Sequence, residues 1–143
     1  LCSESIGFRQ FSGSGGQVDY IRGATLSKGG KSFIAVSSVA NTKNGPVSKI
    51  CLDLLPGSVV TTLRAETMYV VTEYGCVNLQ FCDIPTRAKR LISIAHPDFR
   101  ESLTEEFFRR FPFALKTHLY KNSAESIHCS RRIFYFSISQ LFK

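Results

Sequence analysis

The stretch FSGSGGQVDYIRGATLSKGGK, residues 11–31, decides how the rest of the chain is organised. Three glycines between residues 13 and 16 precede a segment, around Val18 to Ile21, whose apolar residues have helical spacing. Glycine permits positive φ and close approach of the backbone, so the pattern predicts a turn that opens a helix. The unpaired N–H groups at a helix start favour negative charge. The turn could therefore hold a phosphate, a carboxylate or the oxyanion of a carbonyl under attack.

Two familiar glycine motifs are absent from this stretch. The spacing of the glycines does not match GxGxxG, the dinucleotide-binding fingerprint. Lys28 and Lys31 flank a glycine pair but lack the upstream glycine of a phosphate-binding P-loop. Asp19 falls in the first turn of the expected helix, where its charge suits the helix dipole. A turn of this kind by itself is often only a connection between elements.

Beyond the turn, four segments have the composition of strands: residues 31–38, 49–55, 59–63 and 68–72. Between the first two, Asn44-Gly45 is a strong turn signal, and we expect an antiparallel hairpin or a related loop there. The last strand, MYVVT, runs directly into Glu73. Open α/β sheets place their sites at the carboxyl ends of such strands, so Glu73 is a candidate functional residue.

Two helices are predicted after these strands. Asp83 can cap a helix over residues 83–95, with Pro85 in its first turn and apolar residues along one face. A second helix starts at Pro97, and Phe99, Leu103 and Phe107 form its core stripe. Strands mixed with helices favour an α/β domain, with an open mixed sheet and flanking helices.

Charge and composition limit the function classes. The chain has 143 residues, 43% hydrophobic and 20% charged, which is ordinary for a globular domain, and no apolar run is long enough to span a bilayer. The net charge is +7, but residues 1–110 hold 13 Lys and Arg against 10 Asp and Glu, and residues 111–143 hold 5 against 1. Because much of the excess lies after residue 110, we expect neither a nucleic-acid partner nor a membrane partner.

Cysteine and histidine patterns predict no metal site. The five cysteines form no CxxC pair and are odd in number, which fits neither a disulfide framework nor a zinc site and favours a reducing compartment. The three histidines are scattered along the sequence. Cys51 stands in an apolar run and is expected to be a small core residue.

Three long strings together resemble the C-terminal domain of the acetyl-CoA hydrolase/transferase family, which includes acetate and 4-hydroxybutyrate CoA-transferases. They are GSGGQVDYIRGATLSKGGKSFIA, VVTTLRAETMYVVTEYG and RAKRLISIAHPDFRE, in the family's order. The resemblance predicts a CoA-transferase-like C-terminal domain over residues 1–110, truncated at its amino end. Residues 111–143 form a divergent aromatic-basic tail that we leave unassigned, although IFYFSISQLF could be a strand or an amphipathic patch.

The resemblance implies a defined chemistry. A glutamate attacks an acyl-CoA, giving an acyl-glutamyl anhydride and then a glutamyl-CoA thioester. A carboxylate such as acetate or succinate then takes up the CoA, or water hydrolyses the thioester. Coenzyme A and acyl-CoA are then substrates, and no metal is implied. The family's nucleophile lies upstream of the glycine turn, in a segment that this chain does not contain. Glu4 does not match its context, so no catalytic glutamate is assigned.

The resemblance carries over four supporting residues. Gly16 matches the glycine whose N–H helps to form the oxyanion hole and lies against CoA, and Ser12 also lines the CoA site. Lys43 matches a lysine that meets CoA. Glu73 matches a glutamate that orients site groups through hydrogen bonds, although a purely structural role is also open. The chain departs from the family after Asn78-Leu79, where a basic, glycine-containing turn is usual.

Several functions remain open from the sequence. The first is part of an acyl-CoA:carboxylate CoA-transferase or acetyl-CoA hydrolase, active in a longer parent that could be a homodimer and inactive as this piece alone. The second is a non-catalytic CoA-binding or interaction module, the third an incomplete translation product, and the fourth a basic nucleic-acid binder. Acyl-CoA metabolism and reduced cysteines suit the mitochondrial matrix or the cytoplasm.

Overall fold

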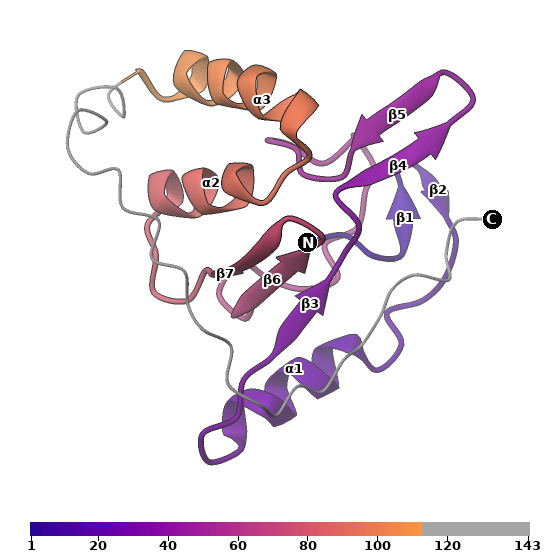
Figure 1. Ribbon diagram of the computed structural model, residues 1–143. Coiled ribbons are helices and arrows are strands. Elements are labelled where there is room, and N and C mark those ends of the chain that lie inside the picture. The colour runs from indigo at the N-terminus through magenta and orange to yellow at the C-terminus, as the bar shows by residue number, and fades with distance from the viewer. Residues whose placement is uncertain (113–143) are drawn as a thin grey trace.

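A computed structural model describes residues 1–112 of the chain and contains three helices and seven short strands in that part. Figure 1 labels them in chain order. The helices are α1 (Gln17–Leu26), α2 (Ile84–Ser93) and α3 (Pro97–Arg110). The strands are β1 (Ser5–Ile6), β2 (Arg9–Gln10), β3 (Phe33–Ala35), β4 (Val39–Thr42), β5 (Gly45–Ser48), β6 (Tyr69–Thr72) and β7 (Gly75–Asn78).

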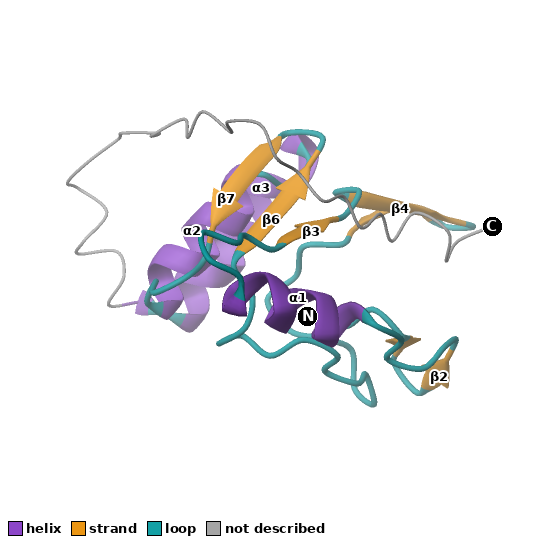
Figure 2. Cartoon of the chain, turned by 90° about the horizontal axis from the view of Figure 1, so that it is seen from below, coloured by secondary structure: helices purple, strands orange, loops and turns teal. Residues whose placement is uncertain are grey.

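A three-stranded mixed sheet forms the centre of this part of the chain. Its order is β3-β6-β7, with β3 parallel and β7 antiparallel to β6. Helix α1 lies on one side of the sheet, and α2 and α3 lie on the other (Figures 1 and 2). The predicted open mixed sheet with flanking helices is confirmed.

The main hydrophobic core fills the space between the sheet and the α2–α3 pair. Val70 of β6 and Leu79, just after β7, pack with Leu103 of α3, and all three side chains are at most 6% exposed. Two further buried residues, Ile94 and Ala95, lie at the α2–α3 junction. The short α2–α3 connection therefore closes the core from one end.

The predicted helices are confirmed with their caps and faces. The carboxylate of Asp83 accepts a hydrogen bond of 2.8 Å from the Thr86 N–H, which starts α2. In α3, Leu103 and Phe107 are buried and Phe99 packs against the core. His96 precedes α3 and its imidazole accepts a hydrogen bond from the Asp98 N–H.

The predicted hairpin exists, but neither of its strands is where the sequence predicted it, since the strand within residues 31–38 is β3, which pairs with β6. Strands β4 and β5 pair from Val39–Ser48 to Thr42–Gly45, so Lys43 and Asn44 form the two-residue loop and Gly45 begins β5. The prediction of a strand over residues 49–55 is wrong. Only Ile50 of that apolar run is buried, while the segment past it turns to the surface.

The predicted strand over residues 59–63 is also wrong. Thr61 and Thr62 donate backbone N–H bonds to the carbonyl of Leu1 instead of joining a sheet, and Val59 and Val60 are exposed. β-Branched residues favour a strand only when a neighbouring strand offers a ladder, and none is offered here. The expectation that Cys51 is a small core residue is wrong, because Cys51 is exposed.

No helix among the described residues is long and apolar enough to cross a membrane. The expectations for residues 113–143, including the IFYFSISQLF segment, lie outside the described part of the chain.

Candidate functional site

The glycine turn leads into α1 as predicted. Gly15 has φ +57°, a conformation that a residue with a Cβ rarely adopts, and Gly16 occupies the N-cap position of the helix. The Gly16 carbonyl accepts the Tyr20 N–H at 3.0 Å, and no side chain caps the helix start. Residues 13–16 of the turn are exposed, whereas Gln17, the first residue of α1, is buried.

The buried residue Glu4 holds the chain that leads into this turn. Its backbone carbonyl accepts the N–H groups of Phe11 and Ser12 at 2.8 and 3.3 Å. Its carboxylate accepts the Gln10 amide at 3.0 Å and the Thr61 hydroxyl at 2.8 Å. Glu4 is 8% exposed and its carboxylate is engaged in these bonds, so it stabilises the segment that leads into the turn.

The start of α1 is fixed from its other side by Gln17, the residue after Gly16. The Gln17 amide donates a 2.6 Å hydrogen bond to the hydroxyl of Thr62, and both residues are buried. Further along the helix, Arg22 forms a 2.7 Å ion pair with Glu66. The segment around residues 61–66 therefore serves as the base on which the glycine turn and α1 rest.

Glu73 stands at the carboxyl end of β6, where the sequence predicted it. Its carboxylate accepts the Ser38 hydroxyl at 2.6 Å and the Ser38 N–H at 3.0 and 3.2 Å. Desolvation raises the pKa of Glu73, but the hydrogen bonds from Ser38 outweigh it and hold the pKa below its ordinary value. Glu73 is thus an ionised hydrogen-bond acceptor at neutral pH, which suits positioning of another group better than proton transfer.

Lys43 lies at the exposed tip of the β4–β5 hairpin, and Glu73 holds the base of that hairpin. Ser38 immediately precedes β4, and its carbonyl accepts the Lys49 N–H at 2.8 Å just after β5. The hairpin tip and the glycine turn lie on the same side of the molecule but apart from each other (Figure 1). The structure therefore brings Glu73 to Ser38, while Lys43 and Gly16 remain separate.

Sequence reasoning missed Ser38, and it noted the turn after Asn78-Leu79 without predicting its conformation. Ser38 is fully buried, and its only signal in the sequence was a serine pair after an apolar strand. In the turn after Asn78-Leu79, Phe81 has φ +57° and is 98% exposed. Arg87 and Arg90 of α2 donate to the carbonyls of Leu79 and Asn78 and so hold this turn in place.

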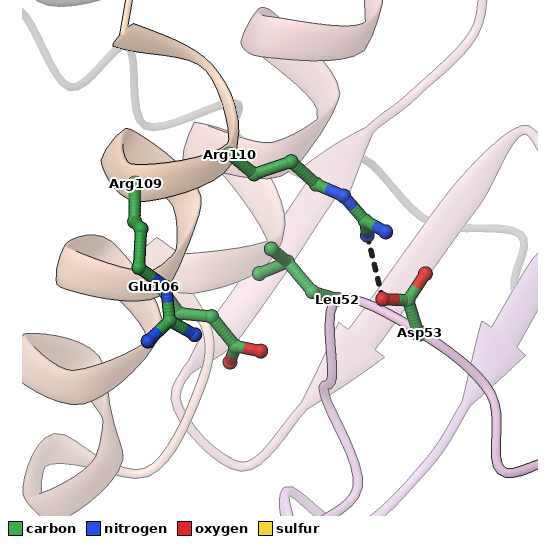
Figure 3. Close-up of a pocket in the computed structure, with 5 residues that line it drawn as sticks. All are labelled: Leu52, Asp53, Glu106, Arg109 and Arg110. Atoms are coloured by element: carbon green, nitrogen blue, oxygen red, sulfur yellow. Dashed lines mark hydrogen bonds and ion pairs between the residues drawn. The ribbon is translucent and has the colours of Figure 1, made fainter.

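Two surface hollows among the described residues lie elsewhere. One of about 250 Å³ is lined by charged residues of α3 and by Leu52 and Asp53 (Figure 3). In it, Arg110 reaches Asp53 at 2.6 Å, an exposed ion pair. Another hollow lies along α3 itself. Both are open, polar surfaces, so neither provides the apolar enclosure typical of a small-molecule site.

Residues 1–112 contain no group of three or more His, Cys, Asp or Glu side chains placed to hold a metal ion. His118, His128 and Cys129 lie outside that range.

The chain matches known proteins both in sequence and in structure. The model of the acetyl-CoA hydrolase/transferase C-terminal domain matches residues 1–107. The chain is 58% identical to the 4-hydroxybutyrate coenzyme A transferase of Clostridium kluyveri, over 78% of this chain and 25% of that protein. It is 48% identical to the butyryl-CoA:acetate CoA-transferase of Anaerostipes caccae, over 74% of this chain and 24% of that protein.

Solved structures agree with these matches. RipA from Yersinia pestis superposes with a TM-score of 0.63 at 45% identity, over 82% of this chain and 24% of that chain. A 4-hydroxybutyrate CoA-transferase from Porphyromonas gingivalis superposes with a TM-score of 0.55 at 41% identity, over 77% of this chain and 25% of that chain. The chain thus spans about a quarter of the length of the proteins it matches.

Proposed function

Because the chain belongs to the acetyl-CoA hydrolase/transferase family, whose C-terminal domain it matches over residues 1–107, we propose that it forms part of an enzyme that moves CoA between an acyl-CoA and a carboxylate. The observation that carries this proposal is the family match together with an exposed glycine turn at an uncapped helix start. Relatives named for 4-hydroxybutyrate, butyrate, acetate, succinate and cyclohexane-1-carboxylate support a small carboxylate as acceptor.

The proposed reaction begins with a glutamate that lies in another part of the enzyme. Its carboxylate oxygen attacks the acyl carbonyl carbon, the C–S bond breaks, and an acyl-glutamyl anhydride and CoA thiolate form. The thiolate then attacks the glutamyl carbonyl, which gives the glutamyl-CoA thioester and releases the first carboxylate. The acceptor carboxylate reverses these two steps, whereas water attacking the thioester produces hydrolysis.

The residues of this chain support that reaction rather than perform the attack. Each tetrahedral intermediate carries an oxyanion, and the N–H of Gly16 is proposed to stabilise it from the exposed helix start. Ser12 lies in the same turn and is proposed to line the CoA site, and Lys43 to meet CoA from the hairpin tip. Glu73 is proposed to fix that hairpin through Ser38 and to act as a positioning residue.

CoA binding by the enzyme completed with its amino-terminal portion tests this proposal. We expect Lys43→Ala to raise the Kd for CoA several-fold while leaving the unfolding midpoint unchanged, because Lys43 is exposed and makes no packing contact in the core. The matched control is Lys28→Ala, an exposed lysine in the loop after α1, which should leave the Kd unchanged. Isothermal titration measures both, and an unchanged Kd for Lys43→Ala removes that residue from the site.

A second function, a CoA-binding module without catalysis, is favoured by one observation. Glu4, the glutamate beside the glycine turn, is committed to hydrogen bonds with Gln10 and Thr61. CoA binding by the 143-residue chain with no acyl exchange, even after the amino-terminal portion is supplied, would select this second function. Acyl exchange by the completed enzyme would select the first.

A further inference from the structure

Two arginines of α2 meet at the turn that connects β7 to this helix. Arg87 and Arg90 stand about one helical turn apart, so their side chains leave the same face of α2. Their Nη1 groups donate to two successive carbonyls, those of Leu79 and Asn78 respectively. Arg90 also reaches the Cys82 sulfur at 3.1 Å. Two guanidinium groups are therefore held at one short segment of backbone.

A third arginine, Arg64, approaches them from the segment before β6. The Leu79 N–H donates to the Met68 carbonyl at 2.7 Å, so the residues just before β6 lie beside the β7–α2 turn. Burial lowers the pKa of Arg87, and the positive charge of Arg64 also lowers it, which places the two guanidinium groups near each other. We call Arg64, Arg87 and Arg90 the arginine cluster.

No carboxylate in the described part of the chain pairs with this cluster. The ion pairs formed there involve other residues. Glu66, the acid nearest to Arg64 in sequence, pairs with Arg22 at 2.7 Å. The carboxylate of Asp83, at the start of α2, accepts the Thr86 N–H at 2.8 Å. The cluster therefore keeps three positive charges in one region without a negative partner from residues 1–112.

The arginines also keep hydrogen-bond donors for a ligand. A guanidinium carries five N–H groups in a rigid fork that matches phosphate and carboxylate oxygens. Arg87 and Arg90 donate only through Nη1 to described residues, and the exposed Arg64 donates to none of them. A single carboxylate would leave most of these charges and donors unpaired. Linked phosphate groups supply more negative charge and more acceptor oxygens.

We propose that the arginine cluster binds a diphosphate group. Two sources share this chemistry: the diphosphate of a free nucleotide and the diphosphate of CoA. The site goes beyond the proposed function, and only CoA as its source would rest on that function. Because Arg64 and α2 belong to different segments, a bound diphosphate would join the segment before β6 to the helix after β7.

The first test is calorimetric titration of the 143-residue chain with inorganic pyrophosphate at fixed ionic strength. We expect saturable binding, and Arg64→Gln should raise the Kd about tenfold, because a charge-assisted hydrogen bond is lost. Arg64 is exposed and forms no hydrogen bond or ion pair with a described residue, so this variant should keep its fold.

The matched control is Arg9→Gln, which removes the same charge. Arg9 is an exposed residue of β2, and Figure 1 shows β2 well away from α2. This variant should leave the Kd for pyrophosphate unchanged. Equal loss of affinity in Arg9→Gln and Arg64→Gln would show only general attraction of an anion to a basic protein, and it would overturn the proposal. Absence of saturable binding to the unsubstituted chain would also overturn it.

Cys82 supplies a second measurement, because Arg90 contacts its sulfur. Mass spectrometry follows the alkylation of each cysteine with and without pyrophosphate. Bound pyrophosphate should slow the alkylation of Cys82 about fivefold, since a nearby anion disfavours the reactive thiolate. The exposed Cys51 should react at its usual rate. Equal rates at Cys82 with and without saturating pyrophosphate would contradict binding at the arginine cluster.

Competition distinguishes the two sources of the diphosphate. Displacement of pyrophosphate by ADP at a lower concentration than by CoA assigns the site to a free nucleotide, and the reverse order assigns it to CoA. Loss of pyrophosphate binding in the enzyme completed with its amino-terminal portion would show that another group occupies the cluster, and it would overturn the proposal. Pyrophosphate binding by a completed enzyme that exchanges no acyl groups would keep the site and refute the proposed function.

Discussion

The carboxylate of Glu73 concentrates three hydrogen bonds from a single residue, Ser38. One partner comes from the end of β6 and the other from the residue before β4, so the contact joins the central sheet to the hairpin that carries Lys43. The ionised carboxylate is the stronger acceptor for these donors, and the hydrogen bonds from Ser38 therefore favour the charged form of Glu73. The structural role of Glu73 and its proposed positioning role therefore rest on the same contact with Ser38.

At this scale we predict that Glu73→Gln lowers the free energy of unfolding by about 1 kcal/mol at pH 7, since an amide replaces the charged acceptor at a solvent-exposed position. The folded-state pKa of Glu73 lies below its ordinary value, so its stabilisation is present above the unfolded pKa. It is lost as the pH falls through the folded pKa. Urea denaturation of both proteins across acidic pH should show the difference shrinking towards zero.

A suitable control for this series is Glu101→Gln. Glu101 is an exposed carboxylate of α3 for which no hydrogen bond or ion pair is present among the described residues. Its substitution should change the unfolding free energy by only a few tenths of a kcal/mol. A Glu73→Gln difference that persists unchanged to the lowest pH would contradict an ionised Glu73 as the source of the stabilisation.

At the scale of elements, the joint between α1 and β3 depends on one close approach. Gly30 lies against the last turn of α1, and its N–H donates to the Ser27 carbonyl at 2.9 Å. A Cβ at Gly30 would overlap the backbone carbonyl of Ala24. The chain can therefore turn from α1 into β3 within a few residues only because this position has no side chain.

Two glycine substitutions should have opposite effects on stability. Gly30→Ala is expected to cost about 1–3 kcal/mol, since backbone must move to relieve the overlap. Gly23→Ala, within α1, is expected to gain about 0.5–1 kcal/mol, because a Cβ there meets nothing within 4 Å and alanine favours the helix. Denaturant unfolding of the two variants beside the unsubstituted chain checks both signs. A loss of stability in Gly23→Ala would contradict the open surroundings of that position.

The sequence predicted correctly the elements whose signals are local. The prediction failed for segments whose conformation depends on contacts with residues distant in the sequence. The Asp83 cap predicted α2 and the glycine turn predicted α1. The apolar run MYVVT predicted β6 with Glu73 at its end. The runs over 49–55 and 59–63 look like strands in isolation, but their neighbours in space are a hairpin base and the first residues of the chain. The contact between Glu73 and Ser38 spans 35 residues, and no local pattern contains it.

At the scale of the whole molecule, the described part of the chain is closed by long-range polar contacts at Thr61 and Thr62. Thr61 donates to the Glu4 carboxylate, and the Thr62 carbonyl accepts the Leu1 amino group at 2.9 Å. The Thr62 hydroxyl accepts Gln17, which follows the glycine turn. Three segments that are distant in sequence thus meet at one threonine pair, away from the main core between the sheet and α2–α3.

Thr62→Val tests whether this meeting point controls the glycine turn. The substitution keeps the shape of the fully buried side chain but leaves the Gln17 amide without its acceptor, at a cost of about 1–3 kcal/mol. We expect faster hydrogen exchange in residues 12–18 and weaker CoA binding by the completed enzyme. Thr67→Val is the control, because Thr67 is also buried but its hydroxyl bonds only to the nearby Leu63 carbonyl. If both variants lose stability and only Thr62→Val speeds exchange in residues 12–18, the glycine turn depends specifically on Thr62. Exchange in residues 12–18 at the same rate in the two variants would show that the turn does not depend on Thr62.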